Sequence, residues 1–165
     1  MSSDAVLHQA AALCLTYPDD DFHPRLLPLI REAAPQLAEF TDHAAATPPG
    51  DLAAHYVQVF DFKNRHSLYL SWWTDGDTRR RGMSLVRFKD VYRAHGLEPT
   101  GEELPDFLPA VLEFTARTGD TRLLTAHHDA LGQLRSRLTA AGTPYAAVLD
   151  AVCATLPSVP TGARR

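Results

Sequence analysis

Apolar residues recur along the chain with the spacing of helix faces. The first set follows the pattern i, i+4, i+7, i+8, i+11, which predicts one apolar face of an amphipathic helix. A proline and three aspartates follow directly, so this helix is expected to end near residue 17. Its apolar positions are Val6, Ala10, Leu13, Cys14 and Tyr17.

Six further segments show the same periodicity. Pro35 falls inside the first of them, and because its ring crowds a carbonyl group and supplies no amide hydrogen, a kink or break is expected between residues 31 and 35. No strand finds a partner and no internal repeat is present. The predicted fold is all-α, one helical domain over residues 1–165 with about seven helices and a frayed tail from about residue 157. These six helices cover residues 26–40, 52–60, 77–95, 104–115, 119–138 and 144–156.

Several residues at the predicted helix ends have the chemistry of caps. Asp51, Asp77 and Thr143 can each accept a hydrogen bond from the first turn of the helix that follows. Gly96 suits the left-handed position that closes a helix. Gly119, with the aspartate after it, is expected to begin the helix over residues 119–138.

The stretch LYLSWWTDGDTRRRG, residues 68–82, does not follow the helical pattern. Its large aromatic residues Tyr69, Trp72 and Trp73 are costly to leave scattered in water. They either fill the core between helices or line a groove for an apolar partner. A groove between helices suits an amphipathic peptide helix. Both interpretations stay open at this point.

Charged residues follow these aromatic residues. Asp75 and Asp77 resemble the start of a calcium loop, but arginines occupy the next ligand positions and no glutamate closes the loop, so a turn is the better interpretation. Arg80 and Arg81 lie in the first turn of the predicted helix 77–95, where cations are disfavoured unless acidic neighbours or a partner compensate. A solvated charged face is favoured over a specific ionic contact, which stays the alternative.

Composition narrows the classes of function. Of the 165 residues 45% are hydrophobic and 22% charged, and the net charge of -4 argues against bulk attraction to nucleic acid or an anionic membrane. Cys14 and Cys153 are far apart and fit no CxxC pattern, which indicates a reducing compartment. No apolar run approaches the ~18 residues of a membrane span, and no basic residue precedes the first apolar stretch. We therefore expect a cytoplasmic protein without a cleaved leader.

No catalytic constellation is recognisable in the sequence. It contains no GxxxxGKS/T, GxGxxG or HExxH motif and no nucleophile elbow. The eight histidines are scattered, and His127 and His128 would point about 100° apart on a helix and could not easily share a metal. We expect neither catalytic residues nor a bound metal. A helix-turn-helix nucleic-acid-binding protein that uses residues 77–95 and a small helical metal-binding protein remain alternatives.

Two longer runs carry a family resemblance. SLYLSWWTDGDTRRRGMSLVRFKDVYRAHG, followed by ELPDFLPAVLEF, resembles the NarJ family, the delta-subunit assembly chaperones of respiratory nitrate reductase, within the TorD/DmsD group. YVQVFDFKNRHSLYL and LCLTYPDDDF resemble it too, so the similarity covers most of residues 5–115. One position departs, because Phe107 stands where the family often has histidine. Any role that needs an imidazole there is not carried over.

The resemblance implies a TorD-like all-helical cytoplasmic chaperone that is not an enzyme. Such proteins bind the N-terminal segment of the apo catalytic (alpha) subunit and promote insertion of bis-molybdopterin guanine dinucleotide before membrane attachment, and they hold no cofactor stably themselves. Molybdenum cofactor biosynthesis proteins are further expected partners, and nucleic acid is not. The chain is expected to be a monomer or a weak dimer.

We expect the client segment to bind as a basic amphipathic helix, with its apolar face on aromatic and aliphatic residues and its cations facing carboxylates. Two arginines are assigned more loosely to the body of the client. The family's hallmark segment supplies residues 103–106 and Leu108 of this set. The predicted client-binding residues are Tyr69, Trp72, Trp73, Asp75, Asp77, Arg80, Arg81, Glu103, Leu104, Pro105, Asp106, Leu108 and Leu112.

Overall fold

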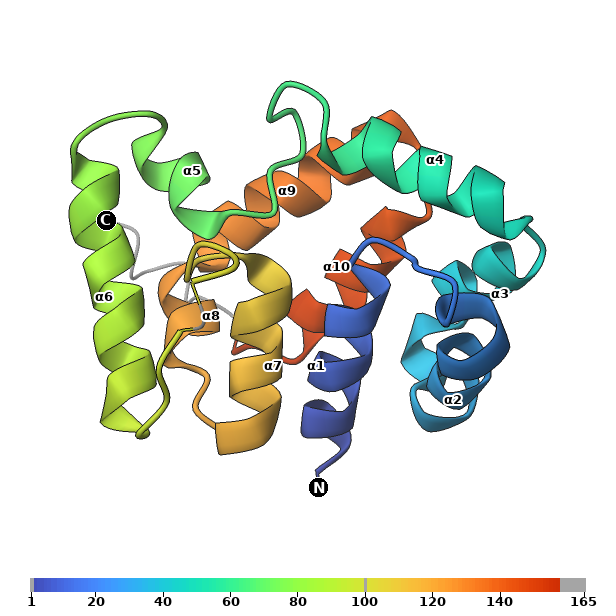
Figure 1. Ribbon diagram of the computed structural model, residues 1–165, viewed down its shortest axis with the longest axis horizontal. Helices are drawn as coiled ribbons and strands as arrows, with labels where there is room; N and C mark the ends of the chain where they lie inside the picture. Colours follow the sequence, from blue (N-terminus) through green and yellow to red (C-terminus); the bar gives the residue numbers. More distant parts are fainter. Residues whose placement is uncertain (1, 100, 158–165) are drawn as a thin grey trace.

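The computed structural model describes residues 2–99 and 101–157, and this part of the chain forms ten α-helices (Figure 1). A π-helical turn, Phe22–Leu26, precedes α2, and a 3₁₀ turn, Pro35–Leu37, separates α2 from α3. No strand forms within the described residues beyond one isolated bridge, so the predicted all-α fold is confirmed. The helices are α1 (Ser3–Cys14), α2 (Leu27–Ala33), α3 (Ala38–Ala45), α4 (Pro49–Phe60), α5 (Leu70–Asp75), α6 (Arg80–Ala94), α7 (Leu108–Thr118), α8 (Arg122–Ala126), α9 (His128–Ala141) and α10 (Tyr145–Ala154).

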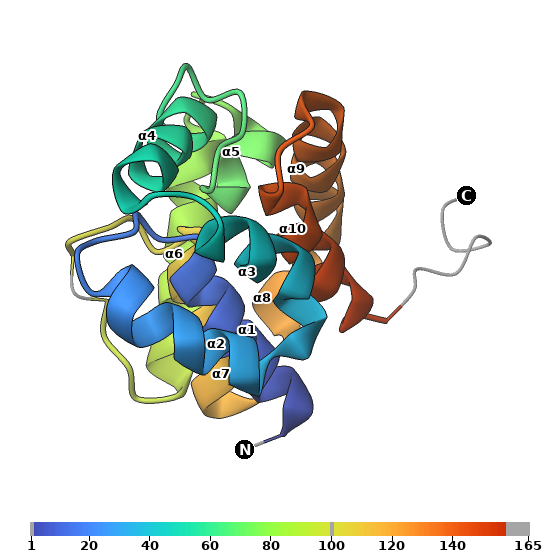
Figure 2. The ribbon, with the colours of Figure 1, turned by 90° about the vertical axis from the view of Figure 1, so that its right-hand side faces the viewer.

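Helix α1 lies near the middle of the molecule, where it packs along α7 and also contacts α10 and α2 (Figure 1). Helices α9 and α10 pack against each other, as Figure 2 shows. Helices α5 and α6 lie at one end of the long axis, and α2 and α3 at the other. Fully buried side chains that include Phe40, Leu112 and Tyr145 form the core between these helices. Most of the apolar positions that the helical period predicts are buried, but Tyr17 and Leu104 are exposed.

Of the three described helices beyond the seven predicted, two come from breaks in predicted helices and one is new. Helix α2 ends at Ala33, just before Pro35, which confirms the expected break. The predicted helix 119–138 is wrong as one piece, because His127 leaves the helical conformation between α8 and α9. Its Nδ1 atom bonds to the carbonyl oxygen of Leu123, and its ring stacks on Phe88. The helix α5 lies within the stretch for which no helix was predicted.

Three of the five residues predicted at helix ends do not have the predicted role. Asp51 and Asp77 make no capping hydrogen bond, because α4 already begins at Pro49 and α6 begins only at Arg80. In α4 the proline with its fixed φ starts the helix at Pro49, three residues before the predicted start at residue 52. Gly119 does not begin a helix but ends α7 in the left-handed conformation, with φ of 74°.

The other two predicted caps agree with the structure. The hydroxyl of Thr143 accepts a hydrogen bond from the amide of Tyr145 at 3.4 Å, at the start of α10. Gly96 has φ of 72° just after α6. Helix α10 ends at Ala154, and the predicted frayed tail, with its final two arginines, falls almost wholly on residues 158–165, outside the described residues. Among the helices described, none is both long and apolar enough to cross a bilayer.

Candidate functional site

The stretch around Tyr69 contacts the segment before α7, which lies 34 or more residues further along the chain. Tyr69 and Phe107 form an isolated antiparallel bridge, and the amide of Leu70 donates to the carbonyl oxygen of Asp106 at 3.1 Å. The expectation that this stretch lacks a partner strand is therefore wrong over a single residue pair. The ring centroids of Tyr69 and Phe107 lie 5.1 Å apart. Phe107 thus makes an aromatic contact with Tyr69.

Asp106 lies at the centre of a buried polar cluster. Its side chain is 0% exposed, and its Oδ2 atom accepts hydrogen bonds from the amide (3.0 Å) and the hydroxyl (2.6 Å) of Ser71. Arg81 places Nη2 3.7 Å from the same oxygen and donates through Nε to the Ser71 hydroxyl at 3.1 Å. The other oxygen, Oδ1, has no hydrogen-bond partner among the described residues. Asp106 therefore ties together α5, α6 and the segment before α7.

Two tyrosines hold the rest of this segment. The hydroxyl of Tyr69 donates a short hydrogen bond to Glu103, and the hydroxyl of Tyr92 donates to the carbonyl oxygen of Pro105 at 2.6 Å. Burial raises the pKa of the Tyr69 hydroxyl well above its usual range, and the bond to Glu103 raises it further. Burial raises the pKa of Tyr92 in the same way. Both hydroxyls therefore act as neutral donors at physiological pH.

Replacing Tyr69 by phenylalanine removes the bond to Glu103 and should lower the free energy of unfolding by about 1 kcal/mol at neutral pH. The pKa of Tyr69 is higher in the folded chain than in the unfolded chain. The stabilisation that its hydroxyl provides is therefore complete below about pH 10 and is lost as the pH rises above that value. Urea unfolding of both chains at neutral and alkaline pH measures this. Tyr17→Phe is the control, since Tyr17 is exposed and donates no hydrogen bond within the described part of the chain. An equal pH profile for wild type and Tyr69→Phe would contradict the assignment.

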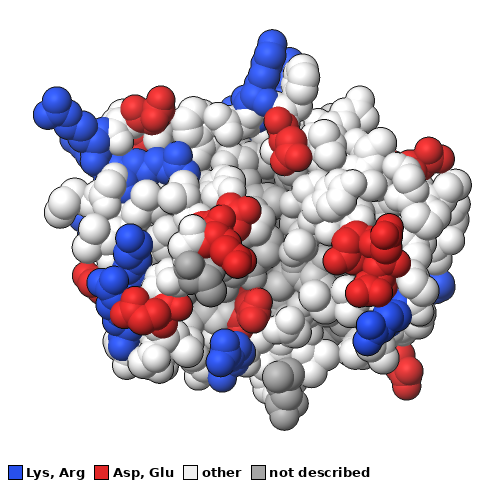
Figure 3. Space-filling model, viewed as in Figure 1, with Lys and Arg blue, Asp and Glu red and all other residues white. Residues whose placement is uncertain are grey.

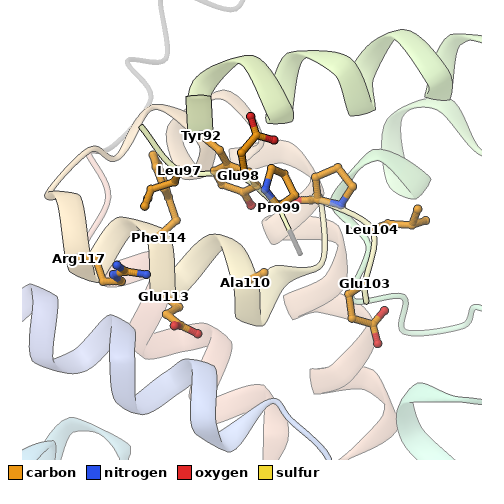
Figure 4. A pocket seen from close by; sticks show the side chains of 11 residues that line it. Tyr92, Leu97, Glu98, Pro99, Glu103, Leu104, Ala110, Glu113, Phe114 and Arg117 are labelled. Carbon is orange, nitrogen blue, oxygen red and sulfur yellow. Dashed lines mark hydrogen bonds between the residues drawn. The ribbon is translucent and has the colours of Figure 1, made fainter. Parts of the chain in front are cut away.

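The segment before α7 borders two adjoining hollows, of about 250 Å³ and about 230 Å³, which share Glu103, Ala110 and Glu113. We call them together the acidic groove. Figure 3 shows acidic side chains gathered over this segment and over α7, and Figure 4 shows the larger hollow with its mixed apolar and acidic wall. Leu104 is 43% exposed at its edge. The groove is lined by Gln9, Ala12, Leu13, Thr16, Tyr92, Leu97, Glu98, Pro99, Glu102, Glu103, Leu104, Pro105, Phe107, Pro109, Ala110, Glu113, Phe114 and Arg117.

The groove offers apolar contact and carboxylates side by side. The apolar part of its wall comes from Leu97, Leu104 and Phe114, and carboxylates stand at Glu103 and Glu113. Such a surface can bury the apolar face of a peptide while its carboxylates meet cations on the flanks. Within the described residues, no three His, Cys, Asp or Glu side chains are placed to hold a metal ion.

The two tryptophans lie apart from this groove. Trp73 packs half-buried against the core, donates its indole N–H to the carbonyl oxygen of Ser67 at 2.9 Å and carries the Arg137 guanidinium 5.6 Å from its ring centroid. Trp72 is half-buried on α5. Neither makes a hydrogen bond, ion pair or ring contact with residues 103–106 in the described structure. Of the two open interpretations, Trp73 fits the one in which it fills the space between helices.

The charged residues of the same stretch face different ways. Asp75 ends α5 and accepts a hydrogen bond from the Ser84 hydroxyl at 2.5 Å, which ties α5 to α6. Asp77 is exposed in the turn between these helices, and Arg80 is exposed at the start of α6. Arg81 points inward to the Asp106 cluster instead. The predicted solvated face therefore holds for Arg80, and the specific ionic contact holds for Arg81.

Four predicted client contacts are buried, and Pro105 is one of them. Leu108, Leu112 and Asp106 are all 0% exposed, so in this conformation they cannot touch a bound peptide. Helix α7 begins at Leu108, and its inward face carries both leucines into the core. Asp106 and the two leucines position the groove instead of lining its surface.

The groove also contains residues that the sequence reasoning missed. Ala110, Glu113 and Arg117 stand at i, i+3 and i+7 on the outward side of α7. This spacing was a usable signal, because residues so spaced share a helix face. The part of the groove wall that α1 supplies includes Leu13, which the helical period predicts only as part of an apolar helix face. Nothing in the sequence shows that α1 and α7 lie side by side.

Comparison with known proteins decides the family. The sequence profile described as nitrate reductase delta subunit matches residues 23–151. The chain belongs to the nitrate reductase delta subunit family. The chain is 37% identical over 157 residues to the nitrate reductase-like protein NarX of Mycobacterium tuberculosis. The matched region covers 91% of this chain and 24% of NarX. It is 31% identical over 165 residues to the NarJ protein of Bacillus subtilis, which is named a nitrate reductase molybdenum cofactor assembly chaperone. This match covers 93% of this chain and 90% of the Bacillus protein.

A further member of the nitrate reductase delta subunit family, the assembly chaperone NarJ of Escherichia coli, is 32% identical over 125 residues, or 74% of this chain and 53% of its own length. The chain thus spans about a quarter of NarX and most of the Bacillus protein. A crystal structure described as that of a redox enzyme maturation protein from Archaeoglobus fulgidus has a TM-score of 0.71 at 18% identity, over 94% of this chain and 93% of that one. At this identity the likeness establishes the shared helical fold. The Bacillus and Escherichia relatives are named as assembly chaperones.

Proposed function

We propose that this chain is an assembly chaperone of a respiratory nitrate reductase and that its acidic groove binds the N-terminal segment of the apo catalytic subunit. Membership of the nitrate reductase delta subunit family supports the role, since relatives along most of the chain are named as such chaperones. The observation that carries the location is the groove itself, where exposed apolar wall and carboxylates alternate.

The client segment would bind as an amphipathic helix with basic residues. Its apolar side chains would enter the hollows beside Leu104 and Phe114, and its cations would face Glu103 and Glu113. Each hollow is large enough for one or two bulky side chains and too small to enclose a helix, so the backbone of the segment would stay at the surface. Burial of the apolar face would supply affinity, and the carboxylates would select basic clients and fix their register.

The groove is prepared for binding by the Asp106 cluster. Asp106 holds residues 103–107 on α5 and α6, and Tyr69 fixes the carboxylate of Glu103. A surface held in its bound shape loses less conformational entropy when the partner arrives. While the groove binds the N-terminal segment in the cytoplasm, membrane attachment of the catalytic subunit would be delayed. The apo subunit would stay open for insertion of bis-molybdopterin guanine dinucleotide.

Molybdenum content of the client tests this role. Cells that lack their own chaperone of this family would receive one of three chains. These are the wild type, Ala110→Trp, which puts an indole on the wall that the two hollows share, and Leu29→Gln at a distant exposed site on α2. We expect the purified catalytic subunit to contain molybdenum with the wild type and Leu29→Gln, and at least about tenfold less with Ala110→Trp. Equal molybdenum content with all three, or none with the wild type, would refute the proposal.

A further inference from the structure

The acidic groove is not acidic along its whole length. Arg117 lines the larger hollow where α7 ends, whereas Glu103 lines both hollows, and Glu102 one of them, before α7 begins (Figure 4). Ala110 and Arg117 are seven residues apart on this helix, which separates the two ends of the groove by about 10 Å. Arg117 is exposed and forms no ion pair with any described residue. The groove therefore has a cation at one end and carboxylates at the other.

The remaining charges of the groove leave this asymmetry in place. Glu98 is paired with Arg93, whose Nε atom lies 3.0 Å from its carboxylate. Glu113 stands one helical turn before Arg117 on the same face of α7, so the guanidinium partly offsets its charge. Glu103 forms no ion pair within the described part of the chain, so no neighbouring cation offsets its charge. The groove is therefore most negative before α7 begins and least negative where α7 ends.

The dipole of α7 itself opposes this asymmetry but is weaker. Its partial charges amount to about half a unit, positive where the helix begins at Leu108 and negative where it ends at Thr118. Glu102 and Glu103 each bring a whole negative charge beside the positive end, and Arg117 brings a whole positive charge beside the negative end. The side chains therefore outweigh the backbone in the field that a bound segment meets.

A helical segment has a direction that matches these two ends. Its amino-terminal end carries about half a positive charge from the backbone, in addition to any terminal amino group, and its carboxyl-terminal end about half a negative charge. We propose that the groove holds the client segment in one direction, with its amino-terminal end beside Glu103 and its carboxyl-terminal end beside Arg117. This inference rests on the proposed function and adds the direction of the segment and the residue that sets it. Arg117 would also select clients, because cations at the carboxyl-terminal end of a segment would be repelled there.

Spin labels on a synthetic peptide of the client's N-terminal segment test the direction. One peptide carries a nitroxide at its amino-terminal end and a second peptide carries it at its carboxyl-terminal end. Each is added to the isotope-labelled chain, whose amide NMR signals lose intensity steeply with proximity to the nitroxide. We expect the first label to reduce the signals of residues 102–104 more than those of residues 116–119, and the second label to do the reverse.

Reversing the charge of Arg117 shows whether this residue sets the direction. Arg117→Glu makes both ends of the groove acidic, so we expect each label to reduce both sets of signals alike. Affinity for the basic peptide should rise about threefold at low salt, because a repulsive charge becomes an attractive one. Arg25→Glu is the matched control, since Arg25 is exposed in the turn before α2 and its substitution changes the net charge equally. This control should keep the direction that the wild type shows.

The two proposals fail separately in this experiment. If the peptide does not bind the wild type, or binds without reducing either set of signals, the acidic groove loses its assigned role and the direction with it. If both labels act alike on the two ends of the wild-type groove, or act in the reverse order, the direction is wrong and the groove keeps its role. A direction that survives in Arg117→Glu would overturn the part assigned to Arg117.

Discussion

Replacing Asp106 by alanine is expected to lower the free energy of unfolding by about 3 kcal/mol. The change removes the acceptor for both donors of Ser71 and the charge that faces Arg81, and all three groups lie in or beside the buried cluster. Asp106→Asn keeps one acceptor for Ser71 but loses the charge, so a smaller loss is expected. The midpoint of urea unfolding, at constant slope, measures both values.

The same substitution should weaken peptide binding at temperatures where the variant is still folded. Asp106 anchors residues 103–107, so without it Glu103 and Leu104 lose their fixed positions at the groove. Asp129→Ala is the control, because the Asp129 side chain is 87% exposed and its change should stay within about 0.5 kcal/mol. If Asp106→Ala proves as stable as this control, the cluster does not hold the segment.

Reversing the charge of Glu113 is expected to have the largest effect on binding without unfolding the chain. Glu113 is exposed on α7, lines both hollows and forms no ion pair within the described residues. Glu113→Lys would place a cation where the basic segment binds, and we expect affinity for the peptide to fall about tenfold to a hundredfold at low salt. Calorimetric titration measures it.

Salt provides the internal check on this prediction. Because the attraction between exposed charges is screened over about 8 Å at physiological ionic strength, the gap between wild type and Glu113→Lys should narrow as salt is raised. Glu32→Lys, on the exposed side of α2, changes net charge equally and should leave affinity nearly unchanged. If both variants lose affinity alike, overall charge governs binding and the groove does not.

The sequence predicted best where structure is local. The helical periods place apolar residues such as Leu52 and Val148 in the core, and Pro35 breaks its helix because its ring and missing amide act within one turn. The split at His127 escaped prediction, since it depends on stacking against Phe88 far away in sequence. Caps failed where a neighbouring residue, such as the proline at the start of α4, moved the helix boundary.

The sequence predicted which residues lie near the candidate site better than it predicted which of their side chains are exposed there. Residues 103–106 and Tyr69 do lie together, and the motif that carries the family resemblance identified them. Burial of Asp106 and Leu112, and the part played by α1, follow from contacts between segments that are distant in sequence, which no local pattern encodes. Trp73 was drawn into the predicted site because a large aromatic residue has the same sequence signature in a core and in a groove.

The central claim is that the acidic groove holds the N-terminal segment of the client, and a calorimetric titration tests it most directly. A synthetic peptide of that segment would be titrated into the wild type and into Ala110→Trp, with the melting temperature of each chain recorded first. We predict one-to-one binding to the wild type with a dissociation constant near or below about 1 µM, and binding weakened at least about tenfold in a folded Ala110→Trp chain. No binding to the wild type, or equal binding to both folded chains, would contradict the account.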